Sequence, residues 1–117
     1  MSYNNKDMVI LLSSLLAIEQ RFNEAEKLLF SLIRLNKDAD ALDLLAKIYA
    51  QQRKFDEAEE IWTLALDTDK TNINYSKALI KCHEMKQNKT NNLNKYIIVL
   101  LILIFVALCI VILQTIF

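Results

Sequence analysis

The chain has 117 residues with neither glycine nor proline, and its 14 basic and 14 acidic residues give a net charge of zero. Sheet folds and phosphate-binding loops use glycine and proline for tight turns and positive φ angles, so this composition argues against both. The balanced charge gives no indication of a nucleic-acid partner. We therefore predict an all-α fold, in which helices are joined by short polar turns.

The first predicted helix, over residues 8–18, is apolar on nearly every side because only two serines interrupt it. A surface helix normally carries a polar stripe. Val9, Leu12 and Leu16 have the spacing of a stripe that faces the domain core. The other apolar residues either fill that core as well or contact another protein chain, and we favour the second. They are Ile10, Leu11, Leu15 and Ile18.

A short motif then occurs twice, since RFNEAE at residues 21–26 recurs as KFDEAE at residues 54–59. The two copies begin at positions 21 and 54, so they are 54 − 21 = 33 positions apart, and we call this separation the repeat period. A fixed period of this length on helices is typical of stacked helical hairpins. Apolar residues at helical spacing before the second copy, and from its phenylalanine onward, predict two antiparallel helices. They are Leu42, Leu45, Ala46 and Tyr49, then Phe55, Ala58, Trp62, Ala65 and Leu66. We expect Asn23 and Asp56 to cap the helices that carry the motif.

This pattern resembles the tetratricopeptide repeat family. The second unit matches through Leu42, Leu45, Ala46, Tyr49, Phe55, Ala58, Trp62 and Ala65, and the first through Leu12, Phe22, Ala25 and Leu29. A third unit begins near Asn72 and supplies only its first helix, with Tyr75, Ala78, Leu79 and Cys82 at core positions. The resemblance covers residues 6–85 and implies a solenoid of two and a half repeats, or about five helices. It also places the small residues Ser13 and Ala46 where helices cross.

The resemblance further implies a binding face, because the first helices of such repeats line a concave groove. That groove is mixed and partly apolar here, which suits a bound peptide or helix. Its residues are Ile10, Leu11, Ser14, Asp43, Leu44, Lys47, Gln51, Lys77, Ile80 and Glu84, and Leu15 and Ile18 complete the candidate partner-binding set. Family members that grip the C-terminal carboxylate of chaperones need lysine and asparagine at set positions of this face. Ile10, Ser14 and Leu44 occupy three of those positions, so we expect no such clamp.

The remaining polar residues give no indication of catalysis. His83 is the only histidine, and it lacks a second ligand at metal-binding spacing. Glu57, Glu59 and Glu60 fall in the first turns of a helix, where they complement its dipole. No nucleophile lies near a base. We expect no enzymatic activity, no cofactor and no metal site.

Beyond residue 85 we predict a polar, basic tether over residues 86–95 and a transmembrane helix over residues 96–117. Residues 1–69 carry a net charge of −5 and residues 70–95 one of +5, and no charged residue follows Lys95. The helix would span roughly 33 Å, about one hydrocarbon core. Lysines on its N-terminal side predict that the repeats face the cytoplasm, and we expect the helix to insert as a single-pass tail anchor.

Together these features lead us to expect a membrane-anchored adaptor or scaffold whose repeats hold a cytoplasmic protein partner at the bilayer. Its expected setting is a multiprotein membrane complex, such as bacterial secretion, motility or envelope machinery, in the bacterial inner membrane or alternatively an endomembrane. Two alternatives stay open. One is a purely structural transmembrane subunit of such a complex. The other is an organelle adaptor similar to the mitochondrial fission adaptors.

Overall fold

The computed structural model describes residues 5–117, and all the regular secondary structure among them is α-helical, as predicted. The helices are α1 (Asn5–Ile18), α2 (Phe22–Asn36), α3 (Ala39–Gln51), α4 (Phe55–Thr68) and α5 (Ile73–Ile116). The chain divides into two units, of which the first ends at Glu84 and the second runs from Met85 to Phe117. The first unit therefore holds α1 to α4 and the start of α5.

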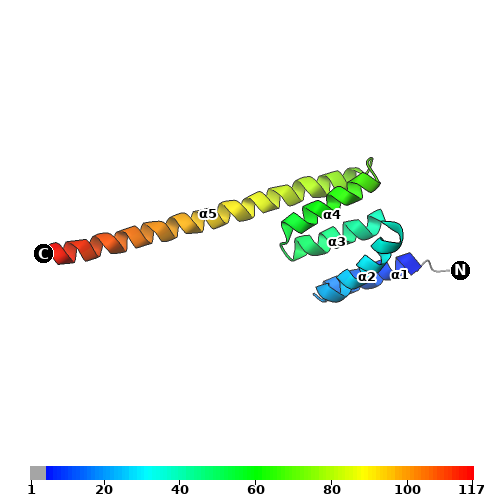
Figure 1. Ribbon diagram of the computed structural model, residues 1–117, viewed down its shortest axis with the longest axis horizontal. Coiled ribbons are helices and arrows are strands. Elements are labelled where there is room, and N and C mark those ends of the chain that lie inside the picture. Colours follow the sequence, from blue (N-terminus) through cyan, green and yellow to red (C-terminus); the bar gives the residue numbers. More distant parts are fainter. Residues whose placement is uncertain (1–4) are drawn as a thin grey trace. The chain divides into compact units, whose positions relative to one another are not determined.

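In the first unit the helices pack as consecutive hairpins, α1 with α2 and α3 with α4, and the second hairpin lies beside the first (Figure 1). The turns after α1 and after α3 share one conformation, since φ is 61° at Gln20 and 60° at Arg53. These two residues are separated by one repeat period. A left-handed residue other than glycine costs about 1–2 kcal/mol, so the packing of each hairpin has to outweigh that strain.

Buried positions follow the same period. Ala25 and Ala58 are completely buried, and so are the small residues Ser13 and Ala46. The members of each pair are again one repeat period apart. Because the equivalent side chains in these two pairs are buried alike, the period seen in the sequence is also a period of packing at these positions.

Three hydrophobic clusters form the core and join the helices in chain order. The first lies among α1, α2 and α3 and includes Leu16, Leu29 and Leu45. The second and third join α3 and α4 to the start of α5 through the buried side chains of Cys82 and Tyr75. Both residues were predicted at core positions, and their burial confirms it.

The predicted caps of α2 and α4 are wrong. Both helices begin at the phenylalanine that precedes Asn23 or Asp56, and their N-cap positions are Arg21 and Lys54. Neither cap residue accepts a hydrogen bond with its side chain. Burial of the phenylalanine of α4 draws its first turn into the core, so packing rather than a polar cap determines where this helix begins.

A side-chain cap is present instead at α3. The Asp38 carboxylate accepts hydrogen bonds from the backbone N–H groups of Asp40, at 2.9 Å, and Ala41, at 3.1 Å. The Lys6 ammonium lies 2.7 Å from the same carboxylate and 3.1 Å from that of Asp40. The hydrogen bonds to Asp38 and Asp40 raise the pKa of Lys6 to about 12. The first turn of α1 is thereby tied to the first turn of α3.

In the second unit, residues 85–116 are helical as part of α5, including residues 86–95, which we predicted as a polar, basic tether. No glycine or proline interrupts this stretch, and each further residue of a helix adds one hydrogen bond once the helix has nucleated. A window of 18 residues in α5 has a mean hydropathy of 3.6, and none of it is buried. Within residues 5–117, α5 is the one helix long and apolar enough to span a membrane.

Candidate partner-binding surface

The residues predicted for the concave groove come from helices that the structure places next to one another. Ile10 of α1 and Leu44 of α3 pack partly against the same core cluster. The hydroxyl of Tyr75 in α5 donates to the Asp40 carboxylate of α3 over 3.4 Å. The exposed members of the set are Leu11, Leu15, Ile18, Lys47, Gln51, Lys77, Ile80 and Glu84. Ile10, Ser14, Asp43 and Leu44 are half-buried.

Three predicted groove residues have partners for their side chains inside the first unit. The indole N–H of Trp62 donates to the Asp43 carboxylate over 2.8 Å, and the Lys47 ammonium lies 2.7 Å from the same group. Ser14 donates its hydroxyl hydrogen to the backbone oxygen of Ile10 over 2.8 Å. The Asp43 carboxylate therefore orients Trp62 within the core, which gives it a structural task in addition to any contact with a partner.

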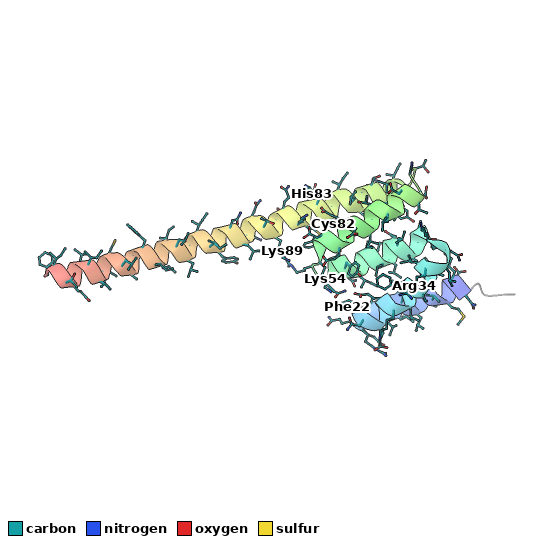
Figure 2. The ribbon with its side chains drawn as sticks, viewed as in Figure 1. Phe22, Arg34, Lys54, Cys82, His83 and Lys89 are labelled. Atoms are coloured by element: carbon teal, nitrogen blue, oxygen red, sulfur yellow. The ribbon has the colours of Figure 1, made fainter. Side chains whose placement is uncertain are left out.

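The start of α5 is held against α4 by polar contacts as well as by the core. Figure 2 shows Cys82 and His83 on the part of α5 that lies beside α4. The Cys82 thiol donates to the backbone oxygen of Phe55 over 3.5 Å, and His83 Nδ1 lies 3.0 Å from Glu59 Oε1. His83 is exposed, as expected for a surface histidine. Glu59, which we predicted only to complement the dipole of its helix, orients this ring.

The most apolar surface of the first unit lies on α1. We call it the outer face of α1; its residues are Met8, Leu11, Leu12, Leu15 and Ile18. Each of them is about half exposed or more. Sequence reasoning placed Leu11, Leu15 and Ile18 outside the domain packing, and their exposure confirms this. It erred for Ile10, which packs partly against the core, and for Leu12, which is 49% exposed.

The reason for the exposure of Leu12 is visible one repeat period later in the chain. Leu45 occupies the equivalent position in α3 and is 0% exposed, because it belongs to the first core cluster together with residues of α1 and α2. No helix among residues 5–117 covers Leu12 in the same way. The sequence pattern of a core position is present at Leu12, but the neighbour that would bury it is not among the described helices.

A groove of about 580 Å³ runs along this surface between α1 and α2. Its residues are Asn5, Met8, Val9, Leu11, Leu12, Leu15, Ser31, Leu32 and Leu35. Only Leu11 and Leu15 belong to the set predicted from the sequence. Two features identify the groove. One is the apolar outer face of α1, which lies beside the stripe that faces the core, and the other is the exposed Leu35 at the end of α2.

Within residues 5–117 no group of three or more His, Cys, Asp or Glu side chains could hold a metal ion. Comparison of the chain with known proteins finds no matching family model, no matching curated protein and no matching solved structure. Function therefore has to be argued from the surfaces of the molecule.

Proposed function

We propose that the chain is a membrane-anchored adaptor, built from repeats of the tetratricopeptide type, which binds a cytoplasmic protein and holds it at a bilayer. The observation that carries the proposal is the exposed outer face of α1 with its apolar groove. Soluble domains rarely leave a contiguous apolar surface uncovered unless another molecule binds there. The regular burial at the repeat period supports the repeat assignment.

Membrane attachment is proposed through residues 96–117. The apolar window of α5 has no buried residue, unlike the core helix of a soluble domain, and it lies far from the N-terminus, unlike a signal sequence. Lys86, Lys89 and Lys95 precede it, and lysines are enriched on the cytoplasmic side of membrane spans. Anchoring to a surface raises the local concentration of whatever the repeats bind, so a groove of moderate affinity can recruit its partner.

The test is proximity labelling in intact cells with a labelling enzyme fused to the N-terminus of the full chain. One matched chain replaces residues 96–117 with polyleucine, and another keeps α5 but replaces Leu11 and Leu15 with aspartate. We expect both the full chain and the polyleucine chain to label the same cytoplasmic protein, and the aspartate chain to lose it. If labelling requires the native residues 96–117 and is unchanged by the aspartate substitutions at Leu11 and Leu15, the chain is a structural transmembrane subunit instead.

A further inference from the structure

The outer face of α1 has a covered counterpart inside the same domain. Ala41, Leu45 and Ile48 of α3 are all buried in the cluster that contains Ala25, Leu29 and Leu32 of α2. The equivalents of these α3 residues in α1, each one repeat period earlier in the chain, are Met8, Leu12 and Leu15. They are 59%, 49% and 50% exposed. The face that α3 buries in this cluster, against α2 and α1, is thus repeated on α1 and left open.

From this register we propose that the outer face of α1 binds one amphipathic α-helix of a partner protein, seated on α1 as α2 is seated on α3. The inference rests on the proposed adaptor function and specifies the partner's binding element. That helix would present a stripe like Ala25, Leu29 and Leu32, with a small residue followed by leucines four and seven positions later. Such spacing keeps the stripe on one side of a helix.

The polar edge of the site adds a charge requirement. Between α2 and α3, the Gln52 amide donates to the Glu26 carboxylate over 3.2 Å. The α1 equivalent of Gln52 is Glu19, which is exposed and lies 3.3 Å from Arg21. A partner helix with glutamate in the place of Glu26 would meet a like charge there. We therefore expect lysine or arginine directly after the small residue of the stripe.

In a second copy of the chain, the helices that carry such a stripe are not available for this site. The two helices of the required type, α2 and α4, have their stripes buried already, since Ala25, Leu29, Ala58 and Trp62 are all covered. The bilayer is also disfavoured as the occupant, because residues 1–69 carry a net charge of −5 and cytoplasmic membrane surfaces are negative. The partner is therefore a helix of another protein.

The experiment uses a fluorescent peptide with the sequence of residues 21–38 and the change Glu26→Lys, together with the full chain in phosphatidylcholine nanodiscs. Fluorescence anisotropy measures binding, and empty nanodiscs measure attachment to lipid. Because an isolated helix of this length is marginal in water, the same segment is also joined to the N-terminus through a Gly-Ser linker. Hydrogen exchange of the α1 amides then reports docking at high local concentration.

We expect saturable binding, or protection of α1 in the linked chain, that falls at least tenfold with Leu12→Asp or Leu15→Asp. The matched control is Leu64→Asp, because Leu64 is 46% exposed on α4 and outside the groove. Glu19→Lys should weaken binding of the Glu26→Lys peptide and strengthen binding of the peptide with the unchanged sequence. Each affinity should change by about twofold to fivefold, the range of exposed ion pairs. Circular dichroism of each variant shows whether its helices are intact.

The proposal is overturned if neither the peptide nor the linked segment docks, or if docking is unchanged by both aspartate variants. It is also overturned if, instead, the wild-type chain associates with itself or attaches to lipid through this face, and the aspartate variants lose that association or attachment. Failure of the adaptor function itself looks different, because the chain with a polyleucine anchor would then label no cytoplasmic protein. If the proximity-labelled protein is still recruited by Leu12→Asp and Leu15→Asp chains, recruitment stands and only its location on α1 is wrong.

Discussion

Leu12 and Leu45 occupy the same position in successive hairpins, so truncating each to alanine separates the repeat pattern from the packing. Leu45 is 0% exposed and Leu12 is 49% exposed. Leu45→Ala leaves a cavity in the core, and such changes cost about 2–5 kcal/mol. Leu12→Ala removes a side chain that is only half buried. Full burial of a leucine is worth about 1.5–3 kcal/mol, so we expect this change to cost about 1 kcal/mol.

The assay is urea unfolding of the full chain in nanodiscs, followed by the fluorescence of Trp62, the only tryptophan and a buried one. With a urea dependence of about 1 kcal/mol per molar for a small domain, the midpoint should fall by about 3 M for Leu45→Ala. For Leu12→Ala it should fall by about 1 M or less. Equal costs for the two variants would refute the reasoning, because they would mean that another element already covers the outer face of α1.

Three further predictions concern polar groups of the first unit. Asp38→Ala should cost about 0.5–2 kcal/mol through loss of the α3 cap. Burial opposes ionisation of Asp38, but hydrogen bonds from Lys6 and the backbone lower its pKa below 3.8, so the carboxylate stabilises the fold above pH 4 and this stabilisation is lost below it. In thermal melts, the melting temperature of the variant should therefore depend less on pH in the acid range. Trp62→Phe should cost about 2 kcal/mol by circular dichroism, because it removes a hydrogen bond to a charged group. Burial and the charge of Asp40 raise the pKa of Tyr75 to about 12, so stability should fall as pH rises above about 10, and Tyr75→Phe should remove that dependence.

Much of the fold could be predicted because its signals are local. The repeated RFNEAE and KFDEAE segments gave the period, and burial of Ala25 and Ala58 shows the same period in the packing. The absence of glycine and proline predicted the all-helical class. The predicted capping residues were wrong because core packing, and not a polar residue in the first turn, determines where α4 begins. This helix starts at its buried phenylalanine.

The candidate surface was only partly predictable, because exposure depends on neighbours and not on the residue itself. Leu12 and Leu45 look alike in sequence, and only the helices packed around them distinguish them. The groove also uses Leu35, which lies on the other helix of the hairpin and has no repeat signal of its own. Residues 86–95, which we predicted as a polar, basic tether, are helical, since polar composition does not end a helix that lacks a breaking residue.

The most direct test of the account is whether the full chain is an integral membrane protein. Membranes from cells lysed without detergent are washed in sodium carbonate at pH 11 and floated through a density gradient. We predict that the chain floats with the lipid, and that Val106→Lys, a charge near the middle of residues 96–117 costing about 2.5–3.5 kcal/mol, weakens its retention. Recovery of the wild-type chain in the soluble fraction would contradict the account.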